Sequence, residues 1–230
     1  MELTQEMIQN LRQDYRAAEL TEKEVDKNPI KQFEKWFSAA LDAQLYEPNA
    51  MTLATTDKTG KPNARIVLLK GFDEQGFSFY TNYLSTKGKE LKKNPQACLV
   101  FFWGELERQV RIEGKVEKLD KETSEKYFHS RPQASQIGAI ASPQSQVISD
   151  RSSIEKKVEE LTATYKDKTI PKPAHWGGYV VKPISIEFWQ GRRSRLHDRI
   201  KYDFVNGKWL NNVSTPMRRF RNGFIFIGSR

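Results

Sequence analysis

Residues 50–82 read AMTLATTDKTGKPNARIVLLKGFDEQGFSFYTN, and this stretch decides the predicted fold. Three β-rich runs, residues 50–55, 64–71 and 77–82, are separated by the turn sequences DKTGKP and DEQG. Runs rich in β-branched and aromatic residues between turn signals of this kind indicate consecutive strands. The spacing therefore predicts an antiparallel barrel, because parallel βαβ units need a helix between successive strands.

The chain on the C-terminal side of this stretch alternates further strands with helices. Helices are predicted at residues 86–94, 121–130 and 152–165. Strands are predicted at residues 97–103, 109–119 and 184–190, followed by a hairpin on Asn206-Gly207, a favoured two-residue turn. Residues 131–146 are rich in small and polar side chains, and residues 169–178 (TIPKPAHWGG) are predicted to form an ordered loop. The fold class that follows is mainly β with flanking helices, an α+β fold.

The N-terminal side carries two helical patterns. Residues 4–19 predict a short polar helix, with Met7, Ile8, Leu11 and Tyr15 along one side, and residues 21–28 form a charged linker. The second helix is better marked, because Asn28 is a plausible N-cap and Pro29 suits the first helical position. Its apolar stripe consists of Phe33, Trp36, Phe37, Ala40 and Leu41.

Composition excludes several classes of protein. The 230 residues are 37% hydrophobic and include 13 Phe and 5 Trp, which is ample for a packed core. No run approaches the roughly 18 apolar residues of a membrane span, and the N-terminus has no signal pattern. Cys98 is the single cysteine, and His129, His175 and His197 lie far apart. The expectation is a cytoplasmic protein without a metal.

The net charge of +9 is concentrated at the C-terminal end. Residues 1–190 hold 28 basic and 27 acidic side chains, whereas residues 191–230 hold 10 basic and 2 acidic ones. A basic end of this kind suits nucleic acid, a membrane surface or a phosphorylated small molecule, and composition does not choose among them. No helix-turn-helix, zinc-finger or RNP pattern is present, and neither GxGxxG nor GxxxxGK[ST] occurs.

Basic residues at the ends of strands and helices are the first candidates for chemistry. Arg65 and Lys70 bracket an apolar strand, so they could hold phosphates at its ends, although an ordinary strand explains this motif alone better. Lys87 lies after Tyr80-Thr81-Asn82 near a predicted helix start, and helix N-termini bind phosphate well. The alternative is a solvated lysine-rich helix. Further along, Tyr127, Arg131 and Ser135 could supply a phenol, a guanidinium and a hydroxyl to one phosphate, unless this is only a helix end stopped by Pro132.

An arginine-rich cluster follows the predicted strand 184–190. It comprises Arg192, Arg193, Arg195, His197 and Arg199, directly after Trp189. A cluster of this kind can pair with anions and stack on aromatic rings, so it suits a flat, charged ring ligand. A solvated basic loop is the alternative.

Taken in order, these motifs resemble the pyridoxamine (pyridoxine) 5′-phosphate oxidase family. The matching motifs are RIVLLK, FYTN, LERQV, KYFHSRP, SQIGA, the Gln144-Ser145 pair, HWGG, IEFWQG and RLHDR. They run from about Leu11 to about Leu210. The resemblance implies an FMN-binding split β-barrel, a homodimer with FMN at the subunit interface, and oxidation of pyridoxamine or pyridoxine 5′-phosphate to pyridoxal 5′-phosphate. Oxygen would be the acceptor and hydrogen peroxide would be released.

The resemblance also implies roles for individual residues. FMN contacts would fall on Arg65, Ile66, Val67, Leu68, Leu69, Lys70, Tyr80, Thr81, Lys87, Gln109, Gln144, Ser145, Trp189 and Arg199. Substrate contacts would fall on Arg12, Tyr15, Lys70, Tyr127, Arg131, Ser135, Arg195, Leu196 and His197. Arg195 and His197 are the catalytic candidates, which would orient the substrate carbon that gives up hydride. His197 is either a general base or a binding group, and no metal is implied.

Three segments are predicted: a mobile N-terminal segment (1–28), the oxidase domain (29–210) and an atypical basic tail (211–230). The tail has no counterpart in the family, whose chains usually end soon after the hairpin tryptophan, here Trp209. A second departure is Thr86, where the family commonly has arginine. A non-catalytic flavin- or vitamer-binding protein on the same barrel, and nucleic-acid binding through the basic end, remain the alternatives to the oxidase.

Overall fold

The computed structural model describes residues 4–11, 14–15, 18–148 and 150–213, which form two compact units. The larger unit comprises residues 46–101 and 111–186; the smaller unit comprises residues 102–110, 187–213 and the N-terminal residues up to 45. The helices are α1 (Gln5–Gln9), α2 (Pro29–Asp42), α3 (Thr86–Lys93), α4 (Lys121–Ser130), α5 (Gln133–Ala141) and α6 (Ser152–Thr164). The strands are β1 (Ala50–Thr56), β2 (Pro62–Leu68), β3 (Gly71–Asp73), β4 (Gly76–Asn82), β5 (Gln96–Trp103), β6 (Arg108–Lys118), β7 (Trp176–Gln190), β8 (Asp198–Val205) and β9 (Lys208–Val213).

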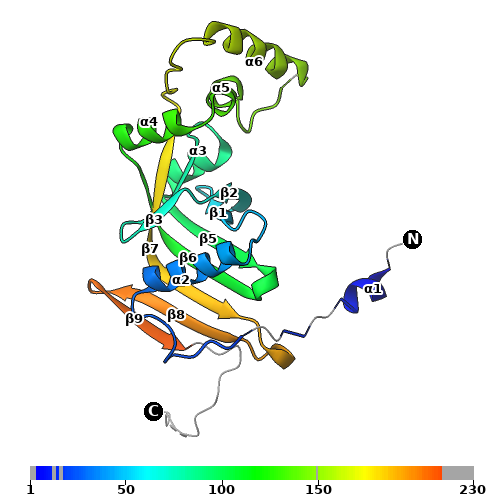
Figure 1. The fold of residues 1–230 in the computed structure, drawn as a ribbon, viewed down its shortest axis with the longest axis vertical. Coiled ribbons are helices and arrows are strands. Elements are labelled where there is room, and N and C mark those ends of the chain that lie inside the picture. The colour runs from blue at the N-terminus through cyan, green and yellow to red at the C-terminus, as the bar shows by residue number, and fades with distance from the viewer. Residues whose placement is uncertain (1–3, 12–13, 16–17, 149, 214–230) are drawn as a thin grey trace, which may run out of the picture. The chain divides into compact units, whose positions relative to one another are not determined.

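The larger unit is built on a curled sheet with the strand order β2-β1-β5-β6-β7-β4-β3 (Figure 1). Strand β1 is antiparallel to both β2 and β5, and β4 is antiparallel to β3 and β7. Alternate residues of β1 are buried, which is the pattern of a strand with one face on a core. The prediction of consecutive antiparallel strands from residues 50–82 is confirmed.

Helices α4, α5 and α6 lie together beyond one end of this sheet (Figure 1). They cover a separate small core made of Phe128, Ile137, Ile170 and Trp176. Helix α4 begins at the N-cap Asp120, whose carboxylate accepts a hydrogen bond from the Thr123 N–H at 2.6 Å. These helices carry several of the predicted site residues, so this small core positions the site.

Two parts of this region were not predicted. Helix α5 falls in the stretch of small and polar residues, and its buried positions are only Ile137 and Ala141. This weak apolar stripe gives little helical signal, and tertiary contacts with α4 and α6 decide the structure. Strand β7 begins at Trp176, so the prediction of a loop across residues 169–178 is wrong over its last three residues. Two glycines, Gly177 and Gly178, obscured that strand start because glycine is depleted in strands.

The smaller unit contains α2, whose start is the one predicted. The Asn28 side chain accepts a hydrogen bond from the Ile30 N–H at 2.8 Å, and Pro29 occupies the first turn. On the buried face, Phe33 lies near Trp103 and Trp36 meets Phe188 edge-on at 5.2 Å between ring centroids. Phe33, Trp36 and Ala40 of the predicted stripe are buried and anchor α2 in the core of this unit, whereas Leu41 is exposed.

Replacing Asn28 with Ala is expected to lower the free energy of unfolding by about 1 kcal/mol, because the Ile30 N–H loses its cap. Urea denaturation monitored by circular dichroism measures the change. Asn10 follows the exposed helix α1, so Asn10→Ala is a matched control that should leave stability nearly unchanged. An equal loss in the two variants would contradict the capping role of Asn28.

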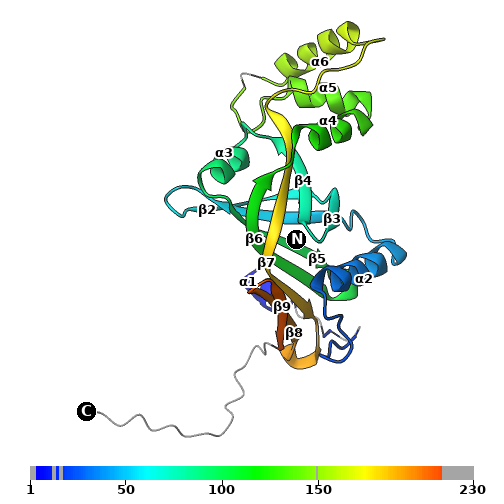
Figure 2. The same cartoon turned by 90° about the vertical axis from the view of Figure 1, so that its left-hand side faces the viewer.

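Strands β8 and β9 form a hairpin on Asn206-Gly207, as predicted (Figure 2). Both turn residues have positive φ, +51° and +78°, which is the requirement of a type I′ turn. The register pairs Phe204 with Trp209 across the hairpin. Strand β9 continues to Val213, so it includes the first three residues of the predicted tail. Residues 214–230 lie outside the described part of the chain.

The N-terminal prediction is wrong in length. Helix α1 covers only Gln5–Gln9 and buries no residue, and none of the described residues between 11 and 20 is helical. The predicted apolar stripe has no core beneath it; instead Tyr15 packs edge-on against Trp189 at 5.7 Å. The Leu20 N–H donates to Asp198 at 3.0 Å, and the Asp26 carbonyl accepts from the Tyr202 hydroxyl at 2.6 Å. The contact of Tyr15 falls within the predicted helix, whereas the contacts of Leu20 and Asp26 tie the segment that follows it to β8.

Candidate active site

The larger unit contains a cavity of about 650 Å³, which we call the main cleft. Its sheet side is lined by Ile66, Val67, Leu68 and Lys70 from β2 and the residues after it, by Tyr80, Thr81 and Asn82 from β4, and by Trp176 from β7. The helices contribute Lys87 from α3, Tyr127 and Arg131 from the end of α4, and Pro132, Ser135, Gly138, Ala139, Ser142 and Gln144 from α5 and its flanks. Three cations and three aromatic rings in one cavity suit a flat ring that carries an anionic group.

Arg131 is the most informative cation of the main cleft. Its Nη2 donates to the Ser135 carbonyl at 2.8 Å, and its guanidinium lies over the Trp176 ring at 4.8 Å from the centroid. Its Nη1 is buried and has no hydrogen-bond partner among the described residues. Burial lowers the pKa of Arg131, and the nearby Tyr127 opposes that shift. A buried donor without an acceptor is costly, so this atom is suited to a ligand oxygen.

Three aromatic rings form a stack along the same wall. The Tyr80 and Tyr127 rings are 3.9 Å apart at an interplanar angle of 23°, and the Tyr127 and Trp176 planes are within 7° of parallel. Burial raises the pKa of Tyr80, with a smaller contribution from Tyr127. The stack fixes the direction in which both Tyr127 and Arg131 face the cleft.

Lys87 lies in the first turn of α3, which begins at the N-cap Ser85. It is only 8% exposed, and its ammonium donates to the Thr81 hydroxyl at a long 3.4 Å. Burial lowers the pKa of Lys87, the positive charge of Arg65 lowers it further, and Glu90 partly opposes both. A buried ammonium at a helix N-terminus is a strong anion site, because the helix dipole adds to its charge.

Arg65 is not among the residues that line the main cleft. Its guanidinium donates to the Leu53 carbonyl at 3.2 Å, to the Thr55 hydroxyl, and to Glu90 at 3.1 Å. Burial acts to raise the pKa of Glu90, but hydrogen bonds from Thr55 and Asn63 and the charge of Arg65 outweigh it, and the pKa is lowered. Arg65 is therefore held as one half of an ion pair beside the cleft.

A second cavity, of about 560 Å³, lies in the smaller unit. It is lined by Leu11, Asp14, Tyr15, Trp189, Arg192, Ser194, Arg195 and His197. The rings of Trp189 and His197 are 4.7 Å apart, and Tyr15 meets both of them edge-on. This cavity thus combines the catalytic candidates with an aromatic wall.

His197 has a defined tautomer in its neutral form. Its Nδ1 accepts a hydrogen bond from the Arg192 backbone N–H at 3.1 Å, so the ring proton of the neutral imidazole is on Nε2. Burial lowers the pKa of His197, and the charges of Arg199 and Arg195 lower it further. The neutral ring is therefore favoured, and Nε2 is a hydrogen-bond donor rather than a base.

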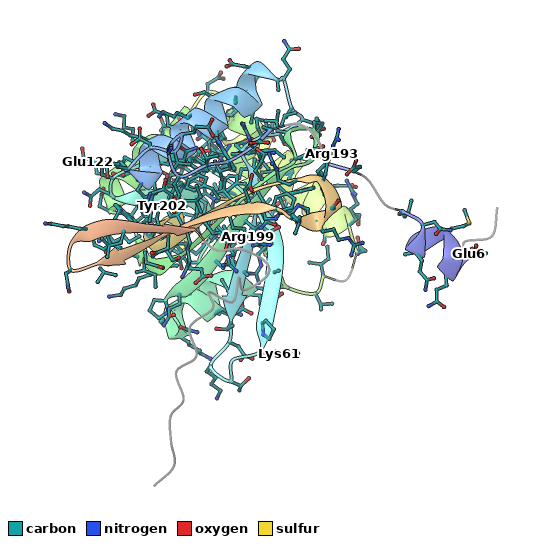
Figure 3. The ribbon with its side chains drawn as sticks, turned by 90° about the horizontal axis from the view of Figure 1, so that it is seen from below. Glu6, Lys61, Glu122, Arg193, Arg199 and Tyr202 are labelled. Carbon is teal, nitrogen blue, oxygen red and sulfur yellow. The ribbon has the colours of Figure 1, made fainter. Side chains whose placement is uncertain are left out.

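The turn that carries Arg195 has unusual backbone geometry. Ser194 and Arg195 have φ values of +55° and +60°, and the Arg195 side chain is exposed. Two consecutive non-glycine residues in this region cost of order 1 kcal/mol or more each, which is typical of functional turns. Figure 3 labels Arg193 in this turn and Arg199 on β8. The Arg199 guanidinium donates to the buried Glu187 at 2.7 Å.

The structure separates the predicted site residues into two sets. The main cleft brings together Ile66, Val67, Leu68, Lys70, Tyr80, Thr81, Lys87, Tyr127, Arg131, Ser135 and Gln144. The second cavity brings together Tyr15, Trp189, Arg195 and His197. Neither cavity is lined by Arg65, Leu69, Gln109, Ser145, Leu196 or Arg199, and Arg12 lies outside the described residues. Leu69 is buried, and Ser145 is exposed with a φ of +66°.

Several lining residues were not predicted. Trp176 is the most important of these, since it supports Arg131 and Tyr127; it lies in the HWGG motif, which was noted only as a motif. Asn82, Pro132, Gly138, Ala139 and Ser142 also line the main cleft. Thr86, the residue that replaces the family arginine, is exposed and is not part of the lining.

None of the helices in the described part of the chain is long and apolar enough to cross a membrane. In the same part of the chain, no three His, Cys, Asp or Glu side chains are grouped so that they could hold a metal ion.

Comparison with known proteins agrees with the resemblance seen in the motifs. Residues 37–165 match a family profile described as pyridoxamine 5′-phosphate oxidase, and residues 176–214 match a pyridoxine 5′-phosphate oxidase C-terminal dimerisation region. A pyridoxine/pyridoxamine 5′-phosphate oxidase from Acaryochloris marina is 57% identical over 93% of this chain and 97% of its own. One from Nostoc sp. is 58% identical over 86% of this chain and 93% of its own.

Solved structures give the same fold. PhzG from Burkholderia lata, in complex with tetrahydrophenazine-1-carboxylic acid, has a TM-score of 0.81 at 28% identity, covering 86% of this chain and 98% of its own. A pyridoxamine 5′-phosphate oxidase-related, FMN-binding protein from Nostoc punctiforme has a TM-score of 0.65 at 16% identity, covering 80% and 97%. The predicted fold class, a mainly β split barrel with flanking helices, is confirmed.

Proposed function

The chain belongs to the pyridoxamine 5′-phosphate oxidase family, and from that premise we propose that it oxidises pyridoxamine or pyridoxine 5′-phosphate to pyridoxal 5′-phosphate with FMN as cofactor. The observation that carries the proposal is the buried, unpartnered Nη1 of Arg131 in a cleft with Lys70, Lys87 and three stacked rings. Cofactor and substrate are both phosphate monoesters on flat heteroaromatic rings, so one set of chemical groups suits both.

The substrate phosphate would be held by Lys70, Tyr127, Arg131 and Ser135, all of which line the main cleft. The guanidinium plane of Arg131 is fixed by Trp176, so its free Nη1 offers a donor in a set direction. A guanidinium with a preset orientation loses little freedom when it binds a phosphate oxygen. Anchoring of this kind holds the substrate ring in one orientation, which contributes to the rate through positioning.

The FMN phosphate would be held by Lys87 and the N-terminus of α3, with Thr81 and Gln144 beside it. The Thr81 hydroxyl donates to the Gln144 side chain at 3.1 Å and accepts from Lys87, so these polar groups lie together in the main cleft. The orphaned donor and the desolvated ammonium in the cleft fit a ligand with phosphate oxygens. Bound FMN would supply the redox chemistry, with oxygen as acceptor and hydrogen peroxide as the released product.

Arg195 and His197 of the second cavity would be the residues that orient the substrate. His197 would donate a hydrogen bond from Nε2, and Arg195 would contribute a positive charge on its strained turn. We assign His197 a binding and orienting role, because Nδ1 is already occupied by the Arg192 N–H and the neutral ring presents a proton. We further propose a homodimer with FMN at its interface, which the match of residues 176–214 to a dimerisation region supports.

A visible absorption spectrum combined with a peroxide assay on the full chain tests the proposal. The purified protein is expected to be yellow, with flavin absorbance, and to release peroxide when pyridoxamine 5′-phosphate is added in air. Flavin binding without turnover would contradict the oxidase activity. Size-exclusion chromatography with light scattering measures the oligomeric state, and a monomer with full activity would contradict the interface position of FMN.

The role of His197 predicts an acid limb in the pH profile. As pH falls through the lowered pKa of His197, the ring takes up a proton at Nδ1 and loses the hydrogen bond from Arg192. The binding contribution is thus present above that pKa and lost below it. Because the pKa is lowered, the fall in kcat/KM should lie on the acid side of about pH 6.5, the ordinary histidine value. In His197→Asn the amide stays uncharged, so kcat/KM at pH 8 should drop about 3- to 10-fold while the acid limb becomes shallower. An unchanged acid limb would show that another group titrates.

A further inference from the structure

Glu90 is a buried carboxylate beside the cations of the main cleft. It lies on α3, three residues after Lys87, and is 8% exposed. Its oxygens accept hydrogen bonds from Thr55 at 2.6 Å, from Asn63 at 3.1 Å and from Arg65 at 3.1 Å. Donors from β1 and β2 therefore fix the carboxylate in place, and its lowered pKa keeps it ionised at neutral pH.

The partner of Glu90 is Arg65, whose two Nη atoms make three hydrogen bonds. The side chains of Arg65 and Glu90 are 19% and 10% exposed, so the pair is shielded from solvent. Nη2 of Arg65 donates to Glu90, and Nη1 donates to the Leu53 carbonyl and the Thr55 hydroxyl. The carboxylate of Glu90 thus balances the positive charge of Arg65, the first residue of the RIVLLK motif.

We propose that Glu90 is an affinity-limiting residue of the flavin phosphate site: by pairing with Arg65 it lowers the net positive charge that is offered, beside Lys87, to a phosphate monoester. This inference rests on the proposed binding of FMN in the main cleft. The net charge of Arg65, Lys87 and Glu90 is +1, and Thr86 adds no charge. The phosphate that they would bind carries close to two negative charges. Glu90 thus sets the phosphate contribution to flavin affinity, while the flavin ring is bound by other groups.

A scaffold role for Glu90 predicts the opposite result. If the carboxylate served only to hold α3 against β1 and β2, removing its charge would loosen the site and weaken binding of every flavin. If it limits affinity by charge, removing the charge strengthens binding of FMN but not of riboflavin, which lacks the phosphate. The ratio of the two dissociation constants therefore separates the two roles, since a general loosening affects both ligands alike.

The test is a fluorescence titration of the full chain, freed of bound flavin, with FMN and with riboflavin. Glu90→Gln, which keeps an acceptor oxygen but removes the charge, is expected to strengthen FMN binding about tenfold. Riboflavin binding should change less than about twofold, since it lacks the charged group. Glu113→Gln is the matched control: Glu113 pairs with Arg111 at 3.5 Å on β6, and neither residue lines the main cleft. It adds the same unit of charge and should leave the ratio unchanged.

Two further variants keep the inference testable if Glu90→Gln is unstable. Asn63→Asp places a second carboxylate beside Arg65 on the exposed side of β2, and should weaken FMN binding about 3- to 10-fold relative to riboflavin. Thr55→Val removes a hydroxyl from the network without changing its charge, so the ratio should stay constant. The inference would be overturned if, in Glu90→Gln, FMN binding relative to riboflavin binding were unchanged or weaker. If the unmodified chain binds neither flavin, it is the proposed function that fails.

Discussion

Replacing Arg131 with Met is expected to reduce kcat/KM for pyridoxamine 5′-phosphate about 100- to 1,000-fold, mainly through KM. Arg131 is a half-buried cation whose Nη1 atom is buried and has no acceptor among the described residues, and the Trp176 ring beneath the guanidinium fixes its plane. A phosphate oxygen bound there gains a charge-assisted hydrogen bond in a partly desolvated site, and methionine supplies neither charge nor donor. Steady-state kinetics over a range of substrate concentrations measures the effect.

Two controls make this result specific. Arg131→Lys keeps the charge but not the planar fork, so about a tenfold loss is expected. Unphosphorylated pyridoxamine should be a poor substrate for both the unmodified enzyme and Arg131→Met, with little difference between them. If both substrates lost rate by the same factor, Arg131 would have a structural role and not a phosphate contact.

Replacing Lys87 with Met is expected to raise the FMN dissociation constant about 30- to 100-fold. The ammonium is desolvated and lies in the first turn of α3, and within the described part of the chain its one hydrogen bond is a long one to Thr81. Riboflavin affinity should change little, since the lost contact is to the phosphate. Lys89 lies on the same helix but is exposed, so Lys89→Met is a matched control with the same change of charge.

The lowered pKa of Lys87 gives this contact a pH dependence with a known sign. Phosphate binding needs the protonated ammonium, so its contribution is present at neutral pH and is lost as pH rises through the pKa of Lys87. FMN affinity should therefore decline on the alkaline side in the unmodified chain and stay flat in Lys87→Met. A parallel decline in both would place the titrating group elsewhere.

Local rules in the sequence account for much of the fold. Asn28 and Pro29 predicted the start of α2, and Asn206-Gly207 predicted the hairpin, because each is a property of a few adjacent residues. The N-terminal helix failed because an apolar stripe forms a helix only where a core covers it, and Tyr15 packs on Trp189 instead. Helix α5 escaped prediction for the opposite reason: its two buried residues give almost no pattern, yet α4 and α6 pack around it.

The candidate site was predictable in its members but not in its arrangement. Motif order identified most of the residues that line the main cleft, including Lys87 and Arg131, but not Trp176. It did not identify Glu90, because a glutamate in a lysine-rich helix has the pattern of a solvated side chain. Its burial depends on Thr55, Asn63 and Arg65, which come from strands more than 20 residues earlier in the chain. Contacts across that separation leave no periodic signal.

The position of β7 in the sheet has a consequence for the order of events during synthesis. This strand lies between β6 and β4, yet it begins at Trp176, after most of the larger unit has been made. Until it leaves the ribosome, β4 and β6 lack a shared neighbour, and Arg131 lacks the ring on which its guanidinium rests. Until β7 is available, the nascent chain therefore leaves one edge of β4 and one edge of β6 without a partner, and unpaired strand edges of this kind are sites of aggregation.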